Sequence, residues 1–170
     1  ITDAKVADLI DAANTAGQAL TVAQDDFDAA ETALADTITA LSTPATVEEL
    51  GAAEAAQEAL TQAAADLQTA VNAATAAKTA ALAAAEAANE ETPDFGTLNT
   101  AITAAQADVN GTAAQTTDSE AATDAKVAAL VTAANTANTA LAAAQGEFDN
   151  AEQALVDALA AMDSPAQPAQ

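Results

Sequence analysis

Apolar residues recur at a spacing of seven along the first part of the chain. One row of them comprises Val6, Ala13, Leu20, Phe27, Leu34 and Leu41. A companion row three residues further on comprises Leu9, Ala16, Ala23, Ala30 and Thr37. Two such rows form a heptad seam, which predicts a long helix that packs against other helices in a left-handed supercoil. We expect this helix over residues 3–41, because Pro44 disfavours helical backbone in the residue before it.

A second long helix is expected over residues 46–89. Thr46 and Glu49 have the spacing of a capping box, in which each side chain bonds the backbone of the other residue at a helix start. The larger apolar residues form a sparser stripe, which comprises Leu50, Leu60, Leu67, Val71 and Leu82. Because the connection to the first helix is short, the two helices should form an antiparallel hairpin.

A short third helix is expected over residues 93–109, with Thr92 as its N-cap and Pro93 at its first position. Its heptad stripe comprises Phe95, Leu98, Ile102, Ala105 and Val109. Residues 110–118 start with an Asn-Gly turn signal and hold no large apolar side chain, so they predict a loop. Residues 117–120 match a second capping box, which should start a fourth helix. If residues 110–118 were helical instead, the fourth helix would continue the third and begin the next module of a rod.

Residues 123–165 repeat residues 2–44, with 25 identities in 43 positions. The repeated seam comprises Val127, Ala134, Leu141, Phe148, Leu155 and Met162, and its companion row comprises Leu130, Ala137, Ala144, Ala151 and Ala158. Repeats of this length are typical of modular arrays. We therefore expect residues 1–122 to be one helical repeat unit and residues 123–165, in a helix starting near residue 118, to begin the next unit. Residues 166–170 are expected to be a disordered tail.

Together these elements predict an all-α fold. We expect an elongated antiparallel helical bundle of three long helices and one short helix, with heptad seams, as part of a repeat array. The sequence leaves open whether the fourth helix closes the bundle within this chain or starts the next module.

The composition favours helices and removes most reactive groups. Of the 170 residues, 58 are Ala, which has the best helix propensity, and 23 are Thr. Only 28 are Ile, Leu, Val or Phe, a level that suits a disordered chain, but the uninterrupted heptad register favours ordered helix. His, Cys, Trp, Tyr and Arg are absent, so imidazole and thiolate chemistry is excluded. We expect no enzyme activity, no catalytic residue, no cofactor and no metal site.

The charge limits the partners. With 3 Lys and 26 acidic residues, the formal net charge of −23 disfavours nucleic acid and anionic membranes. No apolar run approaches the roughly 20 residues of a membrane span, so we expect no membrane insertion. The expected partners are adjacent repeats of the same protein or identical chains, with diffuse divalent cations around the acidic surface.

Two acidic clusters could bind a divalent cation through carboxylate oxygens. They comprise Asp25, Asp26 and Asp28 in one helix, and Glu86, Glu90 and Glu91 near the end of the next. No calcium-loop motif is present, and the second copy has Gly146 and Glu147 in place of the first two acids. We therefore favour solvated acidic faces over specific sites.

Thr21, Thr32 and Thr43 are eleven residues apart, which is similar to the threonine rows of helical fish antifreeze proteins. The second copy replaces them by Ala142, Gln153 and Ser164, so coincidence in a Thr-rich chain is the favoured interpretation.

The Ala-, Thr- and Asp-rich, Lys-poor and Cys-free composition, together with long repeats, resembles that of large secreted bacterial surface proteins of the adhesin type. The resemblance implies an extracellular or cell-surface spacer or stalk without catalysis. A self-assembling helical filament or fibre subunit is the alternative, and an ice- or cation-binding helical module is the third hypothesis. Because the chain starts at Ile1 without a signal-peptide pattern, we expect it to be part of a longer protein.

Overall fold

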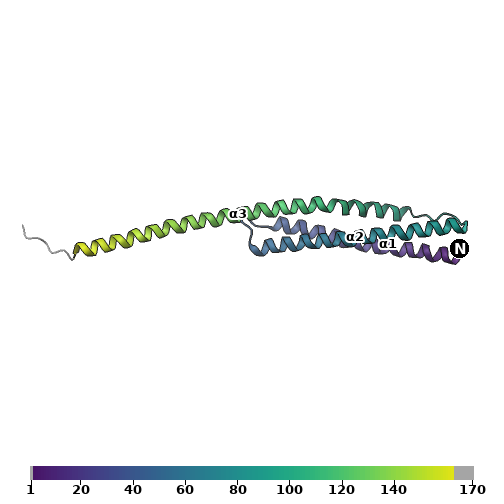
Figure 1. The fold of residues 1–170 in the computed structure, drawn as a ribbon, viewed down its shortest axis with the longest axis horizontal. Coiled ribbons are helices and arrows are strands. Elements are labelled where there is room, and N and C mark those ends of the chain that lie inside the picture. The colour runs from purple at the N-terminus through teal and green to yellow at the C-terminus, as the bar shows by residue number, and fades with distance from the viewer. Residues whose placement is uncertain (1, 163–170) are drawn as a thin grey trace, which may run out of the picture.

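The computed structural model describes residues 2–162 of the chain, without the side chains of residues 160–162. Nearly all of this range is helical and none of it is strand: α1 covers Asp3–Ala40, α2 covers Val47–Ala88 and α3 covers Gly96–Met162. Figure 1 shows α1, α2 and the first part of α3 side by side in a narrow bundle, beyond which α3 continues as a single helix. The first two helices lie within one residue of the ranges expected from the sequence. The tail expected over residues 166–170 lies outside the described range.

The seam of α1 is the core of the bundle. Its six residues, from Val6 to Leu41, are at most 6% exposed, and the companion row is half-buried. Leu20 and Phe27 belong to the same buried cluster as Leu60 and Leu67 of α2. The heptad register predicted for the first helix is therefore confirmed, because side chains seven apart fall on one face of a slightly supercoiled helix.

α1 and α2 run antiparallel. Val6 packs with Ala84 and Ala85 at one end of the pair, and Leu41 packs with Ala53 at the other end. Alanine at these buried positions of α2 lets the two backbones approach closely, so many weak dispersion contacts replace bulky side chains. The predicted hairpin of the first two helices is confirmed.

The capping box at the start of α2 is also confirmed. The Glu49 amide donates to Thr46 Oγ1 at 3.1 Å, and the Thr46 amide donates to Glu49 Oε2 at 2.6 Å. These bonds satisfy two backbone donors that have no partner within the helix. Ser42 Oγ donates to the same Glu49 oxygen at 2.7 Å, which ties the α1–α2 connection to the helix start.

The predicted start of the third helix is wrong by three residues. Thr92 and Pro93 precede the helix, which begins at Gly96. The carboxylate of Asp94 accepts a hydrogen bond from the Gly96 amide at 2.8 Å, so Asp94 satisfies a free donor at the helix start in place of Thr92. Phe95 is buried between α1 and α2 just before the helix begins, which confirms its predicted place in the core.

The predicted loop over residues 110–118 is wrong, because α3 passes through it without a break. The short helix over residues 93–109 is therefore the beginning of α3, and the capping-box pattern at residues 117–120 lies inside that helix. The described residues hold three helices where four were expected.

The core positions of α3 explain this difference. Ala105, Thr112 and Ser119 are buried at a spacing of seven, so the heptad continues past Val109 in small and hydroxyl-bearing side chains. Thr112 Oγ1 donates to the Asp108 carbonyl oxygen at 3.1 Å, which satisfies the buried hydroxyl without interrupting the helix. Because this row contains no large apolar residue, it is not visible in the spacing of large apolar positions.

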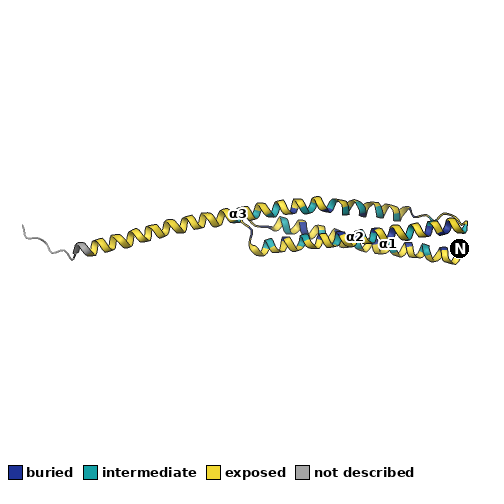
Figure 2. Cartoon of the chain, viewed as in Figure 1, coloured by how far each residue is buried: buried dark blue, intermediate teal, exposed yellow. Residues whose placement is uncertain are grey.

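α3 leaves the bundle where α1 turns into α2. Lys126 Nζ donates to the Leu41 carbonyl oxygen at 3.3 Å and to Thr43 Oγ1 at 2.5 Å. From residue 131 to residue 159 every residue is exposed, as Figure 2 shows for the single helix beyond the bundle. At about 1.5 Å per residue, the 67 residues of α3 span about 100 Å, of which about half lies beyond the bundle.

Candidate interaction surface

The second copy of the seam lies on the single-helix part of α3. We call Val127, Leu141, Phe148 and Leu155 the second-copy face; these side chains are between 39% and 67% exposed. As a member of the repeated heptad seam, Phe148 was expected to pack against another helix, but it is 64% exposed, whereas its equivalent Phe27 is 1% exposed. The predicted seam residue Met162 lies outside the described side chains. Large apolar side chains exposed in one row indicate a contact surface.

Polar contacts attach α3 to α1. Gln24 Nε2 donates to Asp108 Oδ2 at 2.8 Å, and Gln115 Nε2 donates to Glu31 Oε1. The partners are separated by the same number of residues in both pairs, so α1 and α3 run parallel. These residues were not predicted to be in contact, although Gln24 and Glu31 are seven residues apart, as are Asp108 and Gln115.

Polar contacts also attach α3 to α2. They join Lys78 to Asn99 at 2.7 Å, Gln106 to Gln68 at 3.0 Å, and Gln57 to Glu120 at 3.1 Å. The residue numbers rise along α3 as they fall along α2, so these two helices are antiparallel. The bundle therefore has an apolar α1–α2 interface and a third helix whose edges are held by amide and charged groups.

The first acidic cluster does not form a cation site in this structure. Asp25 and Asp26 are exposed on α1, and the Asp28 carboxylate accepts from Gln24 Nε2 at 2.8 Å. Within residues 2–159, no group of three acidic side chains is placed to hold a metal ion. Diffuse association of cations with the acidic surface stays a prediction.

The second acidic cluster lies where α2 ends. Glu86, Glu90 and Glu91 are exposed, and Glu90 lies beside Asp3 at the start of α1. The pKa of Glu90 is raised above its ordinary value by desolvation of the carboxyl first, and then by the hydrogen bond and the like charge of Asp3. Within the described residues, these carboxylates do not belong to a group of three acidic side chains placed to hold a metal ion.

The threonine row is not continuous on one helix. Thr21 is exposed and donates to the Gly17 carbonyl oxygen at 3.2 Å, while Thr43 lies in the turn after α1 and accepts from Lys126. A flat row of hydroxyls free to bind a regular lattice is therefore not formed by Thr21 and Thr43 together.

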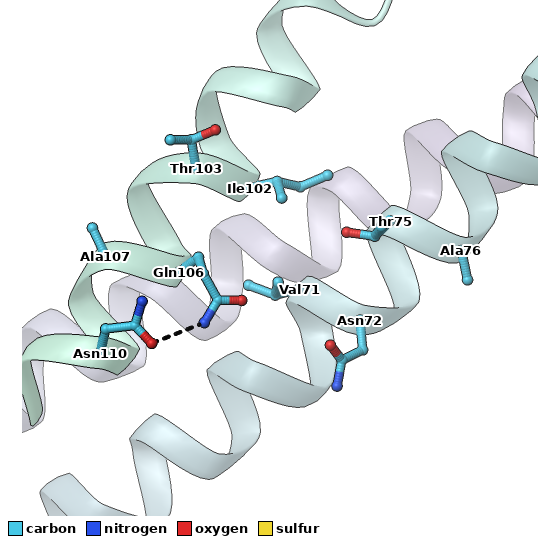
Figure 3. A pocket seen from close by; sticks show the side chains of 9 residues that line it. All are labelled: Val71, Asn72, Thr75, Ala76, Ile102, Thr103, Gln106, Ala107 and Asn110. Atoms are coloured by element: carbon cyan, nitrogen blue, oxygen red, sulfur yellow. Dashed lines mark hydrogen bonds between the residues drawn. The ribbon is translucent and has the colours of Figure 1, made fainter. Parts of the chain in front are cut away.

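An open groove runs between α2 and α3. Figure 3 shows Ile102 and Gln106 of α3 facing Val71 and Thr75 of α2, with Gln106 Nε2 donating to Asn110 Oδ1 at 3.3 Å. No acid, base or thiol lines this groove. It offers no pair of groups for general acid–base catalysis. The absence of enzyme activity stays a prediction for the chain as a whole.

One helix of the described chain is long and apolar enough to cross a membrane by length and composition alone. A window of 18 residues between Gly96 and Leu159 has a mean hydropathy of 1.3 and is not buried. The sequence analysis did not expect such a segment. A single helix that meets this criterion does not establish a membrane protein, so the absence of membrane insertion stays a prediction.

Comparison of the chain with models of known protein families, with curated proteins and with solved structures finds no match. The functional interpretation therefore depends on the fold and on the surfaces described above.

Proposed function

We propose that the chain is a structural spacer or stalk module of a repetitive extracellular or cell-surface protein, without catalysis. The observation that carries the proposal is the continuity of α3. Its first half is the third helix of one bundle, and its second half repeats the sequence of the first helix of that bundle. A helix shared in this way joins one repeat to the next without a flexible loop.

A shared helix suits a spacer because it fixes the direction of the next unit as well as its distance. Bending an α-helix sharply requires a proline, a bulge or an inserted group, and α3 has no proline between Gly96 and Met162. Successive units joined in this way would add length along one axis, as in other repeat proteins in which each unit contacts its neighbours. The extracellular location rests on the compositional resemblance alone.

Small-angle X-ray scattering of the chain tests the rod. A continuous α3 predicts a maximum dimension of about 100 Å or more, whereas a helix folded back at residues 110–118 would give about 60 Å. Ala128→Pro, just beyond the bundle, should bend the exposed helix and shorten the particle, while Ala128→Ser should not. A dimension near the shorter value in the unmodified chain would rule out the spacer.

A self-assembling filament or fibre subunit is the second candidate, and the exposed second-copy face favours it. Light scattering separates the two candidates. A monomer of 16.5 kDa supports the spacer, and an oligomer whose size grows with concentration supports the filament subunit.

A further inference from the structure

We propose that the second-copy face binds an α2-type helix supplied by a neighbouring repeat. By an α2-type helix we mean an alanine-rich helix with large apolar residues at the positions of Leu60, Leu67 and Val71. The inference rests on the proposed function and names the partner of one surface. That surface consists of Val127, Leu141, Phe148 and Leu155, with the alanines between them.

In α1, the equivalent side chains of the first copy pack against α2. Leu20 and Phe27 are each 1% exposed because Leu60 and Leu67 of α2 cover them. Their equivalents Leu141 and Phe148 have the same register and the same neighbours in the seam, but no helix covers them. A row of identical shape is complementary to the same partner surface, since knobs of one helix fit holes formed by the other.

The identities between the two copies concentrate on this surface. Of the 11 positions in the two seam rows, 9 are identical, whereas 16 of the remaining 32 positions are identical. Exposed acids of α1 are among the changes: Asp8 and Asp11 become Ala129 and Thr132. The contact surface has therefore been kept while the solvent face has changed.

The polar side chains of α1 that bond α3 are repeated as well. Gln145 and Glu152 stand at the positions of Gln24 and Glu31, which bond α3 in the bundle. Gln145 Nε2 donates to Asp149 of its own helix at 3.1 Å, but a lipid surface would offer no hydrogen-bond donor to the Glu152 carboxylate, at a cost in free energy. A protein helix pair provides partners for both side chains, so their repetition favours a helical partner over a membrane.

Hydrogen exchange of an extended chain tests the proposal. A second copy of residues 46–122 is joined after Ala166, the equivalent of Ala45, and amide exchange is followed by mass spectrometry. In the unmodified chain, residues 131–159 should exchange fast, because every one of them is exposed. In the extended chain the same amides should exchange roughly tenfold or more slowly, approaching the rates of residues 6–38.

Two variants of the extended chain provide a matched control. Leu141→Asp changes the equivalent of buried Leu20, and Ala143→Asp changes the equivalent of Val22, which is 61% exposed in α1. Both add one negative charge to the same helix. Leu141→Asp should abolish the gain in protection, and Ala143→Asp should retain it. Equal effects of the two variants would overturn the assigned face.

Other occupants give distinct results. Unchanged exchange on extension overturns the proposal. So does protection of residues 131–159 in the unmodified chain that grows with protein concentration, because the occupant would then be a second copy of this chain. Sedimentation of the unmodified chain with phosphatidylcholine vesicles, abolished by Leu141→Asp, would identify a lipid surface instead. Unchanged exchange on extension would leave the length of the monomer measured by scattering unchanged, so the docking surface can fail while the spacer stands.

Discussion

At the scale of single residues, burial depends on which helix lies opposite rather than on the side chain itself. Phe27 and Phe148 share their place in the heptad, yet Phe27 is 1% and Phe148 is 64% exposed. The register of both residues could be predicted from the spacing of apolar positions. Their different exposure could not, because it depends on a partner helix that only Phe27 has in the described structure.

The first prediction compares these two residues. Phe27→Ala should destabilise the bundle by about 3–5 kcal/mol, and Leu20→Ala by about 2–5 kcal/mol, because each leaves a cavity among few large side chains. Phe148→Ala should change stability by less than about 0.5 kcal/mol, since its side chain is already in solvent. Urea unfolding followed by circular dichroism measures all three. A small effect of Phe27→Ala would contradict the packing of the seam.

The second prediction concerns two carboxyl groups with opposite behaviour. The pKa of Glu49 is lowered, first by the hydrogen bond from the Thr46 amide and then by the bond from Ser42. Ionised Glu49 therefore stabilises the folded chain at pH values above the pKa that it has in the unfolded chain. This stabilisation is lost as the pH falls through the lower pKa that it has in the folded chain. The pKa of Glu90 is raised, so its ionised carboxylate opposes folding at neutral pH. This destabilisation disappears as the pH falls through the pKa that Glu90 has in the folded chain, because the carboxyl group then becomes neutral.

Glutamine variants separate the two groups, because glutamine keeps an acceptor and removes the charge. At pH 7, Glu49→Gln should lower the urea midpoint and Glu90→Gln should raise it. Both differences should shrink on acidification, as the carboxyl groups of the unmodified chain become protonated. A Glu49→Gln midpoint equal to that of the unmodified chain at pH 7 would show that the cap does not depend on charge.

At the scale of elements, the helices and their hairpin could be predicted, and the continuity of α3 could not. The cap at Thr46 and the seam ending at Leu41 are local signals with a direct physical cause. Residues 110–118 carry the opposite signals, Asn-Gly and a lack of large apolar groups, but tertiary contacts override them. Thr112 and Ser119 are buried at heptad positions of α3 although neither is a large apolar residue, so the spacing of large apolar residues does not reveal them.

The third prediction uses two glycines inside helices. A Cβ at Gly111 would meet nothing within 4 Å, whereas a Cβ at Gly17 would lie 3.2 Å from Leu98 Cδ1 of α3. Gly111→Ala should stabilise the chain by about 0.5–1 kcal/mol, because alanine has the better helix propensity. Gly17→Ala should gain less or destabilise, because α3 must move away slightly. Thermal unfolding of both variants checks this, and no gain from Gly111→Ala would argue that residue 111 lies outside a stable helix.

At the scale of the whole molecule, the repeat indicates a surface that the chain itself does not cover. An offset of 121 residues places the second seam on the far half of α3, beyond the turn that Lys126 contacts. The sequence left open whether that helix folds back to close the bundle or leads away from it. The continuous helix leads away, so residues 2–162 form a rod with a packed bundle at one end and a single helix at the other.

The last prediction concerns the net charge of −23 on these narrow helices. Few cations oppose it, and two of the three lysines bond neutral groups: Lys78 donates to the Asn99 amide oxygen, and Lys126 donates to Thr43 and to a backbone carbonyl. Folding brings like charges within a Debye length of about 10 Å at 0.1 M salt, so they repel one another more strongly than in the unfolded chain.

The urea midpoint should therefore rise as sodium chloride is raised from about 0.01 to 0.3 M, where screening changes most. Sucrose at matched osmolality controls for effects on hydration, because it screens no charge. A midpoint that falls with salt would mean that attractive pairs outweigh the repulsion, and the two acidic clusters would then have to be reconsidered as cation sites.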